Sequence, residues 1–387
     1  MSHVFPTYAR WNVTPDKGEG SWLTATDGKT YLDLTSGIGV TGLGHRHPKV
    51  EKAIIEQLQK YYHTSNLFQQ PNQEALAKKL IKVTELGAVF FSNSGAEANE
   101  AAIKIAKKAT GKSKIITCNG SFHGRTYATM GATGQEKVRI GYGPMLSKFE
   151  YVDFNDSEQL QRACDEQTAA IMIEMIQGEG GINPITESFV ETIKKVSEKT
   201  GALIIVDEIQ TGIGRTGKAF AYQHFGIHPD IVTAAKGLGN GLPIGAMIGK
   251  KELIEHFGPG SHGSTFGGNP VSTAAALAVT EEVFQEAFLQ DVTAKGQILK
   301  EMLIEKLGEN SIVKDVRAVG LMIGIDLVDE VKVGTIIAEL QKEGVLILPA
   351  GQNVIRLLPP LTITEEEITL AIEKITAVIK QQVTTAK

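Results

Sequence analysis

The sequence predicts an α/β protein built on a mostly parallel sheet that helices cover on both faces, followed by a smaller α+β region. Two observations support this fold class. Short, continuously apolar segments alternate with helical segments between residues 88 and 248, which is typical of sheets buried on both faces. The alternation stops near residue 273, and beyond it strand-like and helical segments are mixed.

The N-terminal part predicts a hairpin and two helices, at residues 20–34, 48–62 and 72–83. The hairpin is indicated by Asp27-Gly28, a turn pair that lies between two strand-like segments. The first helix carries apolar residues at helical spacing, and Pro48 stands at its first position, where a missing N–H costs nothing.

The central part predicts strands at residues 88–91, 114–117, 169–173, 203–206, 231–234 and 244–248, with helices at 96–109 and 189–200. Each of the two helices is followed by a glycine, which commonly ends a helix. Ligands of such sheets bind outside the carboxyl ends of the strands. We therefore expect the loops at Ser92, Phe122, Glu174, Asp207 and Lys236 to form one site.

The C-terminal part predicts a helix at 272–285, strands at 314–319, 321–327, 345–348 and 354–358, and a final helix at 365–380. We expect three parts: an N-terminal segment (1–45) that packs with the small domain, a large domain (46–272) and the small domain (273–387).

Composition excludes several classes of function. The 387 residues are 42% hydrophobic and 21% charged, with a net charge of −5 and no long basic run, so we expect no nucleic-acid partner. Apolar stretches are too short to span a membrane, and the N-terminus lacks the pattern of a signal peptide. Cys118 and Cys164 form no disulfide or metal pattern, and a cytoplasmic location is expected.

Lys236 and Asp207 carry the main chemical prediction, because each follows an apolar strand. A buried lysine has a lowered pKa and is a nucleophilic amine that forms a Schiff base with a carbonyl. An aspartate holds a pyridinium nitrogen, and the two residues together are the minimum set for pyridoxal phosphate. Either residue alone is more simply explained by a surface ion pair.

Other loops carry candidates with simpler alternatives. The Ser94-Gly95-Ala96 turn opens a helix and is suited to a phosphate, or is a plain helix cap. Phe122 is placed to stack on a flat cofactor and Arg125 to bind a carboxylate, or they are a core residue and a surface residue.

A second group of candidates is less specific. Glu179 is a loop acid that either serves the predicted site or is simply solvated. Arg356 is a lone cation in an apolar strand: if buried, it needs a partner such as a substrate carboxylate, and otherwise it faces outward. Ser264 and Thr265 lie in a glycine-rich turn that either contacts phosphate or links domains. His45 and His47 are read as a structural turn, and no metal is expected.

The sequence resembles the class III, ornithine-type aminotransferases of pyridoxal-phosphate fold type I nearly end to end. The matching segments are Gly44-His-Arg-His-Pro48, Ser92-Asn-Ser-Gly-Ala-Glu-Ala98, Phe122-His-Gly-Arg125, Gln177-Gly-Glu179-Gly180, Val206-Asp-Glu-Ile-Gln-Thr-Gly212-Ile-Gly-Arg215, Ala235-Lys-Gly237 and Thr265-Phe-Gly-Gly-Asn269-Pro270. The resemblance implies a seven-stranded, mostly parallel sheet, pyridoxal 5'-phosphate as cofactor, and a homodimer with its active site at the interface.

The resemblance also implies a role for each candidate residue. Lys236 binds the cofactor and moves protons, Asp207 pairs with the pyridinium nitrogen, and Gln210 lies near the phenolic oxygen. Ser94, Gly95 and Ala96 bind the phosphate, together with Thr265 from the other subunit, and Phe122 stacks on the ring. Arg125 and Arg356 bind substrate carboxylates, Glu179 pairs with Arg356 when one carboxylate is absent, and Ser264 is expected to contact substrate.

Within the family, the chain length and the segment from Phe5 to Trp11 are similar to members that act on N2-acetyl-L-ornithine and 2-oxoglutarate in arginine biosynthesis. Ile38 stands where ornithine-specific members have a tyrosine, which disfavours free ornithine as the donor. Ornithine, succinylornithine and 4-aminobutyrate remain alternative donors. A racemase or mutase, and a non-catalytic member, are alternatives of other classes. A nicotinamide enzyme is disfavoured, because the sequence lacks the glycine-rich fingerprint of that class.

Overall fold

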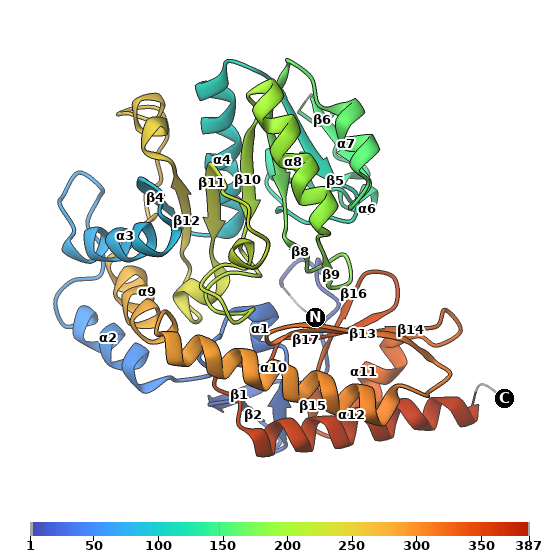
Figure 1. Ribbon diagram of the computed structural model, residues 1–387. Coiled ribbons are helices and arrows are strands. Elements are labelled where there is room, and N and C mark those ends of the chain that lie inside the picture. The colour runs from blue at the N-terminus through green and yellow to red at the C-terminus, as the bar shows by residue number, and fades with distance from the viewer. Residues whose placement is uncertain (1–2, 147, 386–387) are drawn as a thin grey trace.

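The computed structural model describes residues 3–146 and 148–385, and a seven-stranded sheet forms its upper half in Figure 1. The strand order is β4 (Ala88–Ser92), β12 (Gly245–Gly249), β11 (Ile231–Ala234), β10 (Leu203–Asp207), β7 (Thr168–Ile173), β5 (Lys114–Cys118) and β6 (Phe149–Val152). Only β12 is antiparallel to its neighbours, because residues 235–244, which link it to β11, contain the 3-10 segment η2 (Lys236–Gly239) but no helical crossover. The predicted mostly parallel sheet is confirmed.

Both faces of this sheet are buried by helices. The helix α4 (Gly95–Thr110) packs across β11, β12 and β4 on one face, and α8 (Glu187–Thr200) packs on β7 and β10. Neighbouring residues of one strand therefore belong to different clusters: Ile205 packs with the residues of α4, and Val206 packs with those of α8. This burial explains why the inner strands are largely apolar.

The helices next to the sheet include one that is shorter than predicted. α2 (Pro48–Leu58) begins at Pro48 as expected but ends four residues before Tyr62. The side chain of Gln57 donates a hydrogen bond to the carbonyl of Tyr61, 2.9 Å away, and this contact closes the turn that leaves the helix. α3 (Pro71–Thr84) and α9 (Pro270–Val283) agree with the prediction to within two residues at each end, and α9 packs against α2 and α3.

The N-terminal and C-terminal segments of the chain pack together in the lower half of Figure 1. One four-stranded sheet joins β1 (Pro15–Glu19), β2 (Trp22–Ala25) and β3 (Thr30–Asp33) to β15 (Val345–Leu346), and the predicted hairpin is confirmed. A second joins β13 (Val313–Val319), β14 (Met322–Leu327), β17 (Val354–Leu357) and β16 (Leu348–Ala350). α10 (Glu286–Leu307), α11 (Val333–Lys342) and α12 (Glu365–Thr385) pack around them.

Shorter elements complete the chain: α1 (Ser36–Gly39), α5 (Tyr127–Ala132), α6 (Glu136–Arg139), α7 (Ser157–Ala163), β8 (Ile176–Gln177), β9 (Asn183–Pro184) and the 3-10 turns η1 (Ala221–His224), η2 (Lys236–Gly239) and η3 (Lys251–His256). Within the described residues, no helix is long and apolar enough to cross a membrane.

Candidate active site

A cavity of about 440 Å³ lies at the carboxyl ends of the strands, where the sequence predicts the site. The residues that line it include nine of the predicted site residues: Ser94, Gly95, Ala96, Phe122, Arg125, Glu179, Asp207, Gln210 and Lys236. They come from the loops that follow β4, β5, β7, β10 and β11. The predicted convergence of these loops is therefore confirmed.

Lys236 lies two residues after the end of β11, at the start of η2. Its backbone has φ +45°, a left-handed conformation that is uncommon for a residue with a side chain and that clusters at functional sites. Burial lowers the pKa of Lys236, with Glu179 and Asp207 opposing the shift and Arg356 adding to it. The amine is thereby held closer to its neutral, nucleophilic form.

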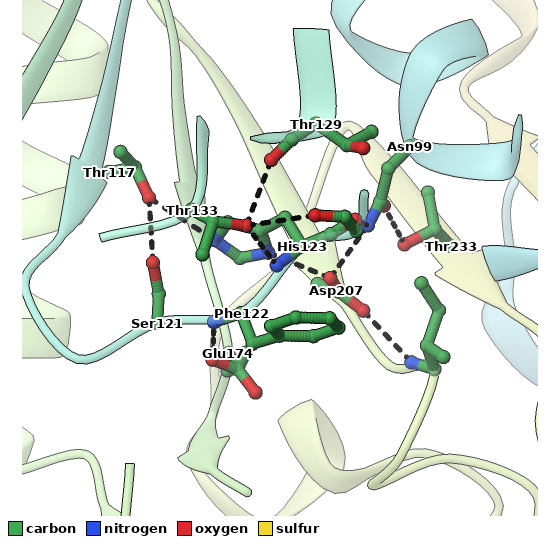
Figure 2. A network of polar contacts seen from close by, with 12 residues as sticks. Asn99, Thr117, Ser121, Phe122, His123, Thr129, Thr133, Glu174, Asp207 and Thr233 are labelled. Carbon is green, nitrogen blue, oxygen red and sulfur yellow. Dashed lines mark hydrogen bonds and ion pairs between the residues drawn. The ribbon is translucent and has the colours of Figure 1, made fainter. Parts of the chain in front are cut away.

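Asp207, at the end of β10, is 3% exposed and sits in the network of Figure 2. Its Oδ2 accepts hydrogen bonds from Asn99 Nδ2 at 2.8 Å and from His123 Nδ1 at 2.7 Å, and its Oδ1 accepts one from the Ile209 amide at 3.0 Å. Burial acts to lower the pKa of His123, but the hydrogen bond to Asp207 and the charge of that carboxylate outweigh it and raise the pKa. The hydrogen bond to His123 fixes the orientation of the Asp207 carboxylate.

The network extends beyond this pair and fixes its members in turn. Asn99 donates to the carbonyl of His123 at 2.8 Å and accepts from Thr233 Oγ1 at 2.7 Å. The His123 amide donates to Thr133 Oγ1 at 3.0 Å, and His123 Nε2 lies 3.2 Å from Thr117 Oγ1. The sequence predicts no role for His123 or Asn99, although His123 lies in the segment Phe122-His-Gly-Arg125 that is shared with the family.

The turn before α4 presents backbone amides to the cavity. Ser94 caps the helix, with its Oγ accepting from the Glu97 amide at 3.2 Å, whereas the amides of Gly95 and Ala96 at the helix start have no partner within the helix. Gly95 is needed here, because a Cβ at this position would lie 2.6 Å from Ile209 Cδ1. A helix start of this kind favours an anion such as a phosphate.

Phe122 and Arg125 lie on the loop after β5. The guanidinium carbon of Arg125 is 5.6 Å from the centroid of the Phe122 ring, and Arg125 is exposed where it lines the cavity. This arrangement offers a flat apolar surface next to an accessible cation, which suits a planar ring and a carboxylate.

Arg356, on β17, lies behind the cavity lining and is held by Glu179 and Gln210. Its Nη1 donates to Glu179 Oε1 at 2.5 Å and to Gln210 Oε1 at 3.0 Å, and Gln210 Nε2 donates to Glu179 Oε1 at 3.4 Å. Arg356 is 2% exposed, and its Nε has no hydrogen-bond partner among the residues that the structure describes. The charge of Arg356 lowers the pKa of Glu179 despite its burial, so the pair is ionic.

Besides Arg356, three predicted features lie outside the cavity lining: Ser264, Thr265 and the histidine motif. Ser264 and Thr265 line a neighbouring hollow, where Ser264 Oγ accepts from Asn93 Nδ2 at 3.0 Å and from the Gly267 amide at 2.9 Å. Their contacts with phosphate and substrate stay predictions. His45 pairs with the buried Asp33 at 3.0 Å, so the histidine motif fixes a turn, and the described residues contain no group of ligands that could hold a metal.

The cavity combines the groups that pyridoxal phosphate requires. It holds a lysine with a lowered pKa, a fixed carboxylate, an aromatic ring and a helix start that favours a phosphate. Together with the mostly parallel sheet, these groups define a pyridoxal-phosphate enzyme of fold type I.

The chain belongs to the class III aminotransferases, because the family model "Aminotransferase class-III" matches residues 6–379. The enzyme is therefore an aminotransferase with pyridoxal phosphate as its cofactor. The relatives include acetylornithine aminotransferase from Halalkalibacterium halodurans, 56% identical over 98% of this chain and 99% of the relative, and that from Bacillus subtilis, 53% identical over 97% of each.

Solved structures support the same family. The ornithine aminotransferase of Toxoplasma gondii is 30% identical, with a TM-score of 0.95 over 99% of this chain and 94% of that chain. The N-acetylornithine aminotransferase of Stenotrophomonas maltophilia is 34% identical, with a TM-score of 0.85 over 98% of each chain.

Proposed function

We propose that this aminotransferase moves the terminal amino group of N2-acetyl-L-ornithine to 2-oxoglutarate, giving N-acetylglutamate 5-semialdehyde and L-glutamate in arginine biosynthesis. Support comes from eight relatives, 47% to 56% identical, that are named acetylornithine aminotransferases. The structural observation that carries the proposal is the Glu179–Arg356 ion pair at the wall of the cavity.

This ion pair explains how one cavity accepts two different substrates. 2-Oxoglutarate has two carboxylates and calls for two cations, Arg125 and Arg356. Acetylornithine has one carboxylate and a neutral amide, so one arginine must be neutralised. Glu179 neutralises Arg356 in the acetylornithine half-reaction and moves away in the other, since an unpaired buried cation is costly.

The positions of the residues around the cavity support the proposed cofactor roles. The amides at Ser94, Gly95 and Ala96 would bind the phosphate, Phe122 would hold the ring, and Gln210 would serve the phenolic oxygen. Bound pyridoxal phosphate supplies an electron sink for the carbon–hydrogen bond next to the amine. Asp207 keeps the ring nitrogen protonated. Lys236 carries the proton between the substrate carbon and the C4′ carbon of the cofactor, and general acid–base catalysis of this kind contributes roughly 10²–10⁴-fold in rate.

We further propose a homodimer whose interface includes the loop of Thr265, with Ser264 contacting substrate. Large apolar side chains are exposed around this loop: Leu67 is 93% exposed and Phe68 66%, and Phe266 is 58% exposed. Asn66 Nδ2 donates to the Gly267 carbonyl at 3.0 Å, so these side chains share one surface with Thr265. Such a patch indicates a protein interface.

The remaining proposals concern domains and location. The parallel pairing of β3 with β15 supports a chain divided into an N-terminal segment (1–45) joined to a small domain (273–387), with a large domain (46–272) between them in sequence. Two unpaired cysteines are in keeping with the cytoplasm.

The decisive experiment compares kcat/KM for N-acetylornithine, succinylornithine, ornithine and 4-aminobutyrate with 2-oxoglutarate as acceptor. We expect N-acetylornithine to be used at least tenfold better than ornithine and 4-aminobutyrate. An equal or higher value for either of these two donors would refute the proposed donor, while transamination itself would stand.

A further inference from the structure

Glu174 is a buried carboxylate in the cavity to which no role is yet assigned. It follows directly after β7, lines the cavity and is 6% exposed. Its Oε2 accepts a hydrogen bond from the Phe122 amide at 3.1 Å, and its Oε1 accepts one from the Gly178 amide at 3.3 Å. Figure 2 shows the first of these contacts beside the Phe122 ring.

The two amides belong to different loops with different tasks. Phe122 carries the ring of the cofactor site and precedes His123, which holds Asp207. Gly178 precedes Glu179, the residue that pairs with Arg356. One side chain therefore bridges the loop that serves the cofactor and the loop that serves the substrate.

We propose that Glu174 is a positioning residue that couples these two loops, and that protonation of its carboxyl group releases one of them. The reason lies in the hydrogen-bonding capacity of the group: an ionised carboxylate accepts at both oxygens, whereas a protonated one turns one oxygen into a donor that faces an amide N–H. This inference rests on the proposed function, which assigns the loop of Glu179 to substrate binding.

The surroundings of Glu174 place this titration near neutral pH. Burial raises the pKa of Glu174 to about 7, with His123 lowering it and Asp207 raising it. Burial lowers the pKa of Lys236 and raises that of Cys118, and the charge of Glu174 acts to raise both pKa values. The remaining partners of the carboxylate are the two backbone amides, which favour the ionised form.

The test uses Glu174→Gln in the full-length holoenzyme. Glutamine has the same shape, bears no charge and accepts at a single oxygen, so it mimics the protonated state at every pH. We expect the Kd of pyridoxal phosphate, measured by equilibrium dialysis at pH 8, to rise roughly tenfold in the variant, the effect of losing one hydrogen bond to a charged group. Between pH 8 and pH 6, the wild-type Kd should approach that of the variant.

Glu208→Gln is the matched control. Glu208 is also a buried carboxylate held by backbone amides, those of Ala221 and Tyr222, and burial likewise raises its pKa to about 7, but it lies outside the cavity lining. The ratio of variant to wild-type Kd should stay near one at all pH values. A Glu174→Gln variant whose Kd follows the wild-type pH dependence, or a control that reproduces the change, overturns the inference.

A second measurement needs no variant. Amide hydrogen exchange of the wild-type holoenzyme, corrected for the intrinsic pH dependence, should show protection at either Phe122 or Gly178 falling roughly tenfold from pH 8 to pH 6. Equal protection of both amides at both pH values contradicts the coupling. Neither readout depends on which donor is used, so failure of the proposed donor leaves this test intact.

Discussion

Replacing Asp207 with asparagine is the most informative perturbation of the cofactor site. The carboxylate is 3% exposed and accepts three hydrogen bonds of 2.7 to 3.0 Å, from Asn99, His123 and Ile209. Asparagine keeps the shape but loses the charge, so it leaves His123 without its ionic partner and removes the anion that we propose for the ring nitrogen of the cofactor. Breaking a buried charge pair costs about 3–5 kcal/mol.

The same anion acts on charge that develops during the reaction, and one such electrostatic group is typically worth about 10²–10³-fold in kcat, so we expect Asp207→Asn to reduce kcat by roughly this factor. Cofactor content should stay near stoichiometric, since the predicted phosphate contacts lie at Ser94 to Ala96, away from the substitution. The assay is a single-turnover reaction with excess glutamate, with cofactor content measured after release in alkali.

Asp230→Asn is the matched control for this prediction. Asp230 accepts from the Ile204 amide at 2.7 Å and pairs with Lys250 at 2.6 Å, just before the start of β11 and so at the sheet edge opposite the cavity. The control should lose stability but keep kcat. A loss of kcat below tenfold in Asp207→Asn, or an equal loss in the control, would refute the reasoning.

Three further predictions follow from the same geometry. Glu179→Ala should shift the ratio of kcat/KM between acetylornithine and glutamate, because Arg356 loses its partner; an equal loss for both donors excludes the switch. Gly95→Ala should raise the Kd of pyridoxal phosphate, since the new Cβ would lie 2.6 Å from Ile209, and an unchanged Kd by dialysis contradicts the phosphate assignment. Glu208→Gln should flatten the pH dependence of stability: burial raises the pKa of Glu208 from 4.5 to about 7, so the native protein binds the extra proton and its free energy of unfolding falls as pH rises through this window. Urea unfolding of the apoprotein between pH 4.5 and 7.5 measures the slope, and an unchanged slope excludes this carboxyl as its source.

Most strands of the sheet were predictable, because the inner strands are buried on both faces and are therefore largely apolar. The strand β6 (Phe149–Val152) escaped prediction, since it lies at the sheet edge, includes Glu150, and is only partly buried. α10 (Glu286–Leu307) was also missed, although Leu289, Val292, Leu299 and Leu303 recur at helical spacing and would have indicated it.

The site was predictable where its residues follow strands and less so where contacts depend on tertiary packing. The carboxylate at Asp207 and the amine at Lys236 were placed from strand ends alone. His123 and Asn99 hold Asp207 only because α4 and the loop after β5 pack together at the end of β10. No pattern in the sequence predicts this packing. Arg356 was expected in the site, but its position behind Glu179 and Gln210 depends on the docking of β17.

Lys236 is the amine that we propose holds the cofactor. Borohydride reduction of the holoenzyme, followed by peptide mass spectrometry, identifies that amine directly. We expect a single phosphopyridoxyl label on Lys236, and we expect Lys236→Ala to lose both the label and the turnover. A label on another lysine, or near-normal turnover of the alanine variant, would contradict it.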